Sequence, residues 1–465
     1  MPDDRLTLAQ AGFDALSGER PRLDLVDRYV AGDHDGPYTP RSATAEYQLL
    51  VKRSISNWLP LLVKTPSQAL AVEGYRRTDA TPDDTVTSAE WQAWQANRLD
   101  GRQTAVHASA LTYGQAFVSV LPSPTDPSVP AVRGISPRRM WAYYADAATD
   151  ALPEWAVEVA DVTVQTGVET KAWLYDAQGV TVLSVNGKAG PVVLGYTPHS
   201  LGVCPVVRFA PDLDLEGRVR GVVEPMIPIQ DRINQTVFDL LVAQTFGSFK
   251  VRTIAGLAPE FERDADGNAL LDPTTGKPKV IPIQADASRF LVAPDADTKF
   301  GQLDETNLAG FLSSIEASVR HLAATSQTPP HYLLGAMVNL SAEALAAAES
   351  ALTRSVDQYK HVFGEAWELV LSLCAQVAGA APDDHGQVVW RDAESRSLSA
   401  TVDALGKAVQ MLNVPARAMW SRIPGATATD VEEWSQMAAE DDPVNALADS
   451  LAKVGTPAAG AALAA

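Results

Sequence analysis

Histidine is the residue type best suited to bind a metal ion or to act as a general base near neutral pH. The chain has seven, at His34, His107, His199, His321, His331, His361 and His385. No two have the HExxH spacing, or another close spacing, that would place two imidazoles on one metal ion. His331 lies in an apolar stretch, where a packed or solvent-facing loop histidine is the plainer interpretation. The histidines therefore indicate neither a metal centre nor a catalytic base.

Two turn-rich stretches contain part of a binding motif and lack the rest. Residues 271–278, LDPTTGKP, lack the first glycine and the final serine or threonine of a nucleotide-binding P-loop. Asp264, Asp266 and Asn268 match the first ligand positions of a calcium-binding loop. Gly267 comes earlier than the glycine of such a loop, and Thr275 occupies the twelfth position, where a glutamate ligand is expected. A plain hairpin turn is the simpler interpretation of the second stretch.

We therefore expect no cofactor, no metal ion and no enzymatic activity. The Gly-rich dinucleotide fingerprint and the GxSxG nucleophile elbow are both absent from the sequence. Cys204 and Cys374 lie far apart in apolar surroundings, which indicates buried thiols in a reducing compartment rather than a disulfide or a nucleophile. An enzyme whose site assembles only in three dimensions stays open as an alternative.

The charge balance is strongly acidic, with a formal net charge of -20 over 465 residues. A sequence-specific nucleic-acid binder would need a basic surface for its phosphate contacts, so that class is disfavoured. A protein past which DNA slides without adhering is not excluded. One stretch does gather basic residues, at Lys250, Arg252, Lys277 and Lys279. They could meet phosphates or an acidic partner, or simply protect the edges of exposed strands.

The elements that would position these residues are of mixed type. The length predicts two or more structural regions, and the hydrophobic content of 46% permits a sizeable core. No window of 18 apolar residues and no N-terminal apolar signal core is present, so we expect no membrane association. The N-terminal part is predicted to be helical, with two short helices over residues 6–16 and 21–30.

Residues 130–210 are predicted to form a sheet. Short β-rich runs alternate there with Pro, Gly, Asp and Asn turn signals. The runs cover residues 140–144, 155–159, 171–175, 180–185, 192–196 and 206–209. Because no helical segments separate them, a doubly wound parallel sheet is not expected, and the fold class is predicted to be α+β.

Helix is predicted again over residues 218–246, followed by a small β-containing insert. Asp304 is a suitable N-cap for a second helix, which should end near Thr325 because Thr328-Pro329-Pro330 cannot continue it. The loop that follows is apolar. Ser341 then caps a helix that runs to Ala378, with a length of roughly 55 Å. Such a length suggests a spine in an assembly. A terminal helical cluster begins near residue 398.

Four motifs in this order resemble the portal proteins of tailed bacteriophages, specifically those of the long-tailed, siphovirus type. They are LTYGQAFV at 111–118, GVVEP at 221–225 with IQDRIN at 229–234, TPPHYLLG at 328–335 followed by LSAEAL at 340–345, and FGEAW at 363–367. The resemblance covers about residues 20–440.

The resemblance implies a portal-like α+β subunit with named regions. They are a mixed wing with N-terminal helices (1–217), a first stem helix (218–247), a β-containing clip (248–303), a second stem helix (304–326), a tunnel loop (327–340), a long spine helix with its return to the wing (341–395), a helical crown (396–440) and a flexible acidic, Ala-rich tail (441–465).

It also implies a homo-oligomeric ring, a dodecamer, at one capsid vertex, with a channel through which double-stranded DNA is packaged and ejected. The implied partners are the major capsid protein, the terminase large subunit and the head-tail adaptor protein, in a virion assembled in the host bacterial cytoplasm. We expect the apolar face of each spine helix to bury against a neighbouring subunit. A phage head-tail structural or adaptor protein without a channel is the alternative.

The resemblance assigns two sets of site residues. The tunnel loop would face DNA through Gln327, Pro329, Pro330, His331, Tyr332, Met337 and Asn339. The clip would make its contacts through Lys250, Arg252, Lys277 and Lys279.

Overall fold

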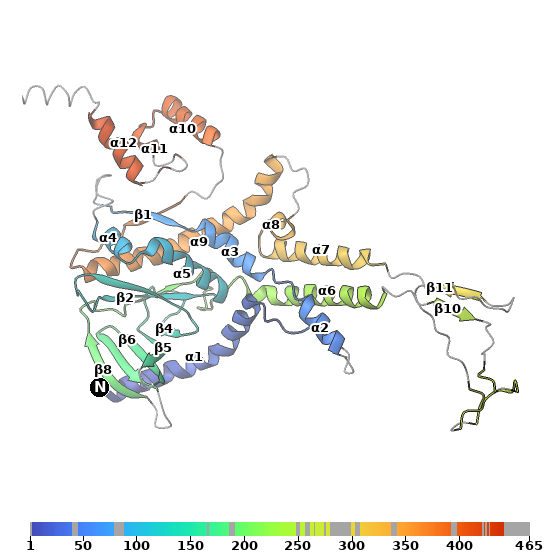
Figure 1. Cartoon of the computed structure of the whole chain (residues 1–465). Helices are drawn as coiled ribbons and strands as arrows, with labels where there is room; N and C mark the ends of the chain where they lie inside the picture. The colour runs from blue at the N-terminus through green and yellow to red at the C-terminus, as the bar shows by residue number, and fades with distance from the viewer. Residues whose placement is uncertain are drawn as a thin grey trace, which may run out of the picture. The chain divides into compact units, whose positions relative to one another are not determined.

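The computed structural model describes most of the chain, and these residues form two compact units (Figure 1). The first unit contains Met1–His34, Asn57–Gln230 and Val319–Ala465, and the second contains Asp35–Ser56 and Asp231–Ser318. Each unit is thus built from segments distant in the sequence. The described residues are 2–39, 45–78, 88–164, 167–185, 191–247, 252–255, 261–264, 266–273, 276–279, 299–302, 307–335, 342–391, 398–420, 423, 426 and 428–440.

The first unit contains a five-stranded sheet in the order β4-β5-β6-β7-β8, in which every adjacent pair is antiparallel. This confirms a turn-connected sheet for the predicted runs from residue 140 to residue 196 and the absence of a doubly wound arrangement there, whereas the predicted run 206–209 belongs to a second sheet. The strands are β4 (Met140–Tyr143), β5 (Trp155–Val164), β6 (Gly167–Asp176), β7 (Gly179–Ser184) and β8 (Val192–Pro198).

Both faces of this sheet are covered. Alternate residues of β5 point to opposite faces. Trp155 and Val157 pack with Ala9 of the N-terminal helix, whereas Ala156 packs with Phe117 and Val206 of a second sheet. That sheet has the order β3-β2-β9. Its strands are β3 (Pro130–Ile135), β2 (Ala116–Pro122) and β9 (Val206–Phe209).

The N-terminal helix α1 (Pro2–Ala31) is continuous, where the sequence predicts two shorter helices separated near Pro21. A proline in a helix interior removes one backbone N–H from the hydrogen-bond ladder. Leu16, on one side of Pro21, and Leu23 and Val26, on the other, are all buried. The apolar stripe therefore continues across the proline, and its burial offsets the lost hydrogen bond.

Helix α9 (Ala342–Val377) is the predicted spine helix, with 36 residues and a length of about 54 Å. It contacts elements of its own chain, among them β2, β9, α4 (Ala89–Ala96) and β12 (Gln387–Trp390). The expectation that its apolar stripe buries against a neighbouring subunit is wrong for residues 356–374, because that part of the stripe already lies in the subunit's own core. Its buried residues include Val356, Phe363, Trp367, Val370 and Cys374.

Helix α5 (Leu99–Tyr113) meets α9 at an aromatic cluster. Trp367 Nε1 donates a hydrogen bond to His107 Nε2 at 2.8 Å. The rings of His107 and Phe363 stack with their centroids 5.2 Å apart. Burial lowers the pKa of His107 to about 3. The ring is therefore neutral at physiological pH, and its proton lies on Nδ1 because Nε2 accepts.

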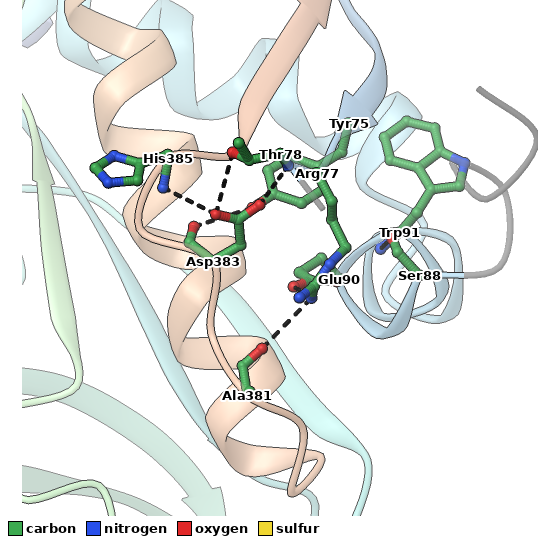
Figure 2. Close-up of polar contacts among 9 residues, drawn as sticks. All are labelled: Tyr75, Arg77, Thr78, Ser88, Glu90, Trp91, Ala381, Asp383 and His385. Atoms are coloured by element: carbon green, nitrogen blue, oxygen red, sulfur yellow. Dashed lines mark hydrogen bonds and ion pairs between the residues drawn. The ribbon is translucent and has the colours of Figure 1, made fainter. Parts of the chain in front are cut away.

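A polar network joins the end of β1 (Val72–Arg76) to the segment that follows α9 (Figure 2). Asp383 Oδ2 accepts a hydrogen bond from the Thr78 backbone N–H at 2.6 Å. Arg77 Nη1 lies 2.6 Å from Oε1 of Glu90, which is fully buried. The Arg77 charge offsets the cost of burying the Glu90 carboxylate. The network thus supports the antiparallel pairing of β1 with β12.

The helix predicted over residues 218–246 begins later, at α6 (Ile227–Gly247), after the single 3₁₀ turn η2 (Glu224–Met226). The reason lies in the preceding residues. The Val222 backbone N–H donates to the Leu111 carbonyl at 2.8 Å. A Cβ on Gly221 would lie 2.5 Å from the Thr112 carbonyl oxygen. This segment therefore crosses the end of α5 in close backbone contact and cannot be helical.

Helix α7 (Ala309–Thr325) also begins later than predicted. Its expected cap, Asp304, lies outside the described residues, and Asn307 Oδ1 accepts a hydrogen bond from the Ala309 N–H at 2.9 Å. The predicted end at Thr325 is confirmed. No helix in the described ranges combines the length and apolarity needed to cross a bilayer.

The turn over residues 263–269 confirms the simpler interpretation of the aspartate-rich stretch. Asp264 Oδ1 accepts hydrogen bonds from the backbone N–H groups of Asp266 at 3.0 Å and Asn268 at 2.8 Å. This carboxylate oxygen is therefore used to close the turn. Arg263 and Ala269 form an antiparallel bridge on either side of it.

The remaining described elements complete both units. Strands β10 and β11 pair antiparallel in the predicted insert, and the last three helices match the predicted terminal cluster. The elements are α2 (Ala45–Ser54), α3 (Leu59–Ala69), β10 (Arg252–Ala255), β11 (Lys299–Gln302), α8 (Pro330–Leu334), α10 (Leu398–Leu412), α11 (Arg417–Trp420) and α12 (Ala428–Glu440).

Candidate functional site

The candidate site is the segment Gln327–Gly335, which connects α7 to α9 and which we call the connecting segment. Gln327 adopts a left-handed conformation with φ of 54°. The Thr328 N–H donates back to the Ala323 carbonyl at 3.0 Å, which closes the end of α7. Pro329 and Pro330 then prevent the helix from continuing. The sequence predicts an irregular loop here, but Pro330 instead begins the short helix α8, because proline suits a first helical position.

Three buried residues and one hydrogen bond hold the connecting segment in place. Thr328 and Leu333 are only 4% and 8% exposed, and Pro329 is also buried. The Trp58 indole Nε1 donates to the Leu333 carbonyl at 3.3 Å. The Trp58 backbone N–H in turn donates to Gln230 Oε1 at 3.1 Å, which fixes the position of the tryptophan. One side of the segment is therefore anchored to the subunit.

The opposite side of the connecting segment is exposed. Gln327, Pro330 and Tyr332 are accessible to solvent, and the Tyr332 side chain is 45% exposed. The Ser355 hydroxyl of α9 donates to Gln327 Oε1, which orients the amide. The surface offered is an amide, a proline ring and an aromatic ring. It lacks lysine and arginine, so it can contact a polyanion without a strong ionic attraction.

Glu349 of α9 supports the two ring side chains of α8. His331 Nε2 lies 3.9 Å from Glu349 Oε1, and the His331 side chain is only 11% exposed. The rings of His331 and Tyr332 lie with centroids 4.6 Å apart. Burial raises the pKa of Tyr332, and the Glu349 charge and hydrogen bond raise it further. Tyr332 is therefore a neutral phenol at physiological pH, and the packed interpretation of His331 holds.

The predicted residues are brought together only in part. Gln327, Pro329, Pro330, His331 and Tyr332 share the connecting segment, but Pro329 is buried and does not face outward. Met337 and Asn339 lie outside the described residues. Sequence reasoning missed the supporting residues, which are Trp58, Glu349 and Ser355. Trp58 is 275 positions from Leu333, and no local sequence pattern predicts the hydrogen bond between them.

The predicted basic contacts are only partly described. Lys250 lies outside the described residues, and Arg252 is placed through the backbone of β10 alone. Lys277 and Lys279 are exposed neighbours in the residue 261–279 hairpin. Lys279 Nζ lies 2.6 Å from Glu262 Oε2. Part of the positive charge in this hairpin is therefore used locally.

The described residues offer little to a metal ion or to a nucleophilic reaction. Among them, no group of three or more His, Cys, Asp or Glu side chains is placed to hold a metal. Cys204 and Cys374 are buried free thiols. Burial raises the pKa of both, which keeps them protonated and unreactive.

Comparison with known proteins identifies the family. The family described as "Phage portal protein, SPP1 Gp6-like" matches residues 13–444. The chain belongs to this portal protein family. The match extends over nearly the whole chain, and it confirms the resemblance carried by the four sequence motifs. A portal protein is a component of the phage particle.

Two curated relatives are similar over most of their length. The portal protein of Mycobacterium phage D29 is 30% identical over 368 residues, which cover 75% of this chain and 71% of the relative. The portal protein of Mycobacterium phage L5 is 29% identical over the same shares of both chains. A chain in a solved structure titled "Virion of native gene transfer agent (GTA) particle" covers 87% of this chain and 100% of its own length. Its TM-score of 0.40 at 12% identity is too low to define a shared fold.

Proposed function

We propose that copies of this portal-family chain form a ring, a dodecamer, around a channel at one capsid vertex. Double-stranded DNA passes through the channel during packaging and ejection. The observation that carries this proposal is the family match over residues 13–444. The terminase large subunit and the head-tail adaptor protein dock on the ring, and the major capsid protein surrounds it. The ring assembles in the host bacterial cytoplasm and remains in the virion.

We assign the regions of the ring subunit along the chain. The assignment is supported by the order of the described elements, with α6 before the β10–β11 pair, α7 after it, and α8 between α7 and α9. The regions are the wing (1–217), first stem helix (218–247, with its helix from Ile227), clip (248–303), second stem helix (304–326), tunnel loop (327–340), spine and return to the wing (341–395), crown (396–440) and tail (441–465).

The connecting segment is the described part of the tunnel loop, and its exposed side faces DNA. Gln327, Pro330 and Tyr332 supply neutral contacts. A chain of net charge -20 makes an acidic ring, which lowers phosphate adhesion. Neutral contacts in an acidic channel let a duplex move past without falling into a deep energy well. Packaging work then comes from a separate nucleotide-hydrolysing motor.

Negative-stain images of the purified chain test the ring directly. We expect rings with a central hole. A uniform monomer at high protein concentration and across salt conditions would overturn the proposal. Rings without a hole would favour the alternative, an adaptor or other structural protein without a channel.

The double variant Gln327→Ala, Tyr332→Ala tests the tunnel loop. Both side chains are exposed, so the variant should form normal rings, whereas deletion of the loop would also remove the buried Leu333. We expect reduced DNA content per particle in a complementation assay with a portal-deficient phage. Tyr38→Ala, at a tyrosine that is 79% exposed elsewhere in the chain, is the matched control. Normal DNA content in the double variant would remove the assigned role while leaving the ring intact.

A further inference from the structure

The first unit contains a cleft of about 610 Å³, whose lining comes from α1, β4, β9 and the segment before α6. A volume of this size suits a small ligand or a short stretch of peptide. The lining is richer in arginine than in carboxylates, although the whole chain is acidic. Its charged members are Glu19, Arg22, Arg208, Arg218, Arg220 and Glu224. Which of these charges a ligand can use depends on the ion pairs that each already forms.

Arg22 is compensated by the two carboxylates of the lining. Its Nη2 lies 2.9 Å from Glu19 Oε2, and its Nη1 lies 2.8 Å from Glu224 Oε2. Two carboxylates against one guanidinium leave a net negative charge on this side of the cleft. A polyanion such as a nucleic-acid backbone is therefore disfavoured here, because like charges repel at short range.

Arg218 and Arg220 lie on a short hairpin and are compensated within it. Arg218 pairs with Glu216, and Arg220 Nη2 lies 3.7 Å from Asp214 Oδ2. Asp214 Oδ1 accepts hydrogen bonds from the backbone N–H groups of Glu216 at 3.0 Å and Arg218 at 2.9 Å, and an antiparallel bridge closes the hairpin. Both arginine side chains are more than half exposed, so water screens their charges further.

Arg208, on β9, has a fixed position and no carboxylate partner. Its Nη2 donates to the Ala147 carbonyl at 2.7 Å, and its guanidinium carbon lies 4.2 Å from the centroid of the Tyr144 ring. Tyr144 is itself buried, so its ring holds the guanidinium in place. No carboxylate in the part of the chain that the structure describes forms an ion pair with Arg208. Most of the five N–H donors of this half-buried cation are therefore left for a ligand.

We propose that Arg208 anchors a carboxylate-bearing ligand in this cleft, either the acidic side chain of a peptide segment or a small carboxylic acid. A guanidinium binds a carboxylate through two parallel N–H···O hydrogen bonds, and a carboxylate supplies the single negative charge that Arg208 lacks. Trp141 and Tyr143 also line the cleft and offer aromatic surface to the apolar part of the ligand. The site lies within one chain, so the inference does not depend on the proposed ring.

Ligand-observed NMR on the purified chain tests the carboxylate. The probes are the capped tripeptide N-acetyl-Ala-Glu-Ala-amide, its Gln analogue, acetate and inorganic phosphate. The glutamate peptide should bind at least about tenfold more tightly than the Gln analogue, because a charge-assisted hydrogen bond replaces a neutral one. Tighter binding of the peptide than of acetate identifies a peptide segment as the source, and equal binding identifies a small carboxylic acid. Equal binding of the Gln analogue, tighter binding of phosphate, or no binding of either carboxylate would overturn the inference.

The variant Arg208→Gln locates the site. It removes the charge but keeps a donor for the Ala147 carbonyl, and the glutamate peptide should bind at least about tenfold more weakly. Arg208→Lys, which keeps the charge without the planar fork, should weaken binding severalfold and serves if the glutamine variant does not fold, as checked by thermal unfolding. Arg102→Gln, at an exposed arginine on α5 outside the cleft, is the matched control. Unchanged affinity in both Arg208 variants, or an equal loss in the control, would overturn the assignment.

Discussion

At His107, one hydrogen bond decides which ring nitrogen carries the proton. Trp367 Nε1 donates to Nε2 at 2.8 Å, so protonation of Nε2 would place two donors against each other. Burial lowers the pKa of His107 to about 3, from a usual value of 6.5. The unfolded chain therefore binds this proton more readily than the folded chain does. Stability should be fully present above pH 6.5 and should be lost as the pH falls toward 3.

The variant His107→Gln tests this linkage. Glutamine retains an acceptor for Trp367 Nε1 but does not titrate. Between pH 6.5 and 3, the free energy of unfolding of the unsubstituted protein should fall more steeply than that of the variant. The difference in slope should approach about 1.4 kcal/mol per pH unit. Unfolding temperatures measured across this range provide the check, and parallel profiles for the two proteins would contradict the assignment.

At the scale of elements, the close crossing of α5 and the segment before α6 determines where helix α6 can start. Gly114 caps α5 with φ of +93°, and a Cβ there would lie 2.9 Å from the Gly221 nitrogen. Both positions thus require glycine, one for its backbone conformation and both for space. Pro225 and Pro228 come next, after a segment whose backbone conformation this crossing has already determined.

The variant Gly114→Ala should therefore destabilise the protein by about 1–3 kcal/mol, from backbone strain together with the close contact. Gly310→Ala is the control, because Gly310 lies in α7 with nothing within 4 Å of its added Cβ. That substitution should be neutral or stabilising by roughly 0.5–1 kcal/mol, since alanine favours a helix. Urea unfolding midpoints distinguish the two. Equal shifts for both variants would show that the crossing does not matter.

At the scale of the whole molecule, the net charge of -20 makes exposed basic positions distinctive. Lys277 and Lys279 are exposed, and Lys279 already pairs with Glu262 at 2.6 Å. Lys277 is therefore the cleaner probe of the proposed clip contact. Exposed charges of this kind mainly steer association, and their effect weakens with added salt.

The variant Lys277→Glu should weaken binding of the ring to the terminase large subunit or to the head-tail adaptor by about two- to fivefold at low salt. Titrations of each purified partner onto the ring measure the effect. Lys64→Glu is the control, because Lys64 is also exposed, on α3 of the proposed wing. Unchanged affinity for both partners would remove the clip assignment of this lysine.

Sequence alone determined the elements whose signals are local. Alternating apolar runs predicted the strands, proline predicted the end of α7, and spacing predicted the stripe of α9. The same local rules failed at Pro21 and before α6, where packing against distant residues outweighs propensity. The four family motifs can be read from the sequence, but the structure brings together only part of the site that they imply.

Tertiary structure decided which surfaces meet. It placed the stripe of α9 from Val356 to Cys374 in the subunit's own core and joined Trp58 to Leu333. Residue types and spacing encode backbone conformation and which face is apolar, because those depend on near neighbours. They do not encode the partner of that face, because many distant surfaces satisfy the same pattern and only the packed chain selects among them.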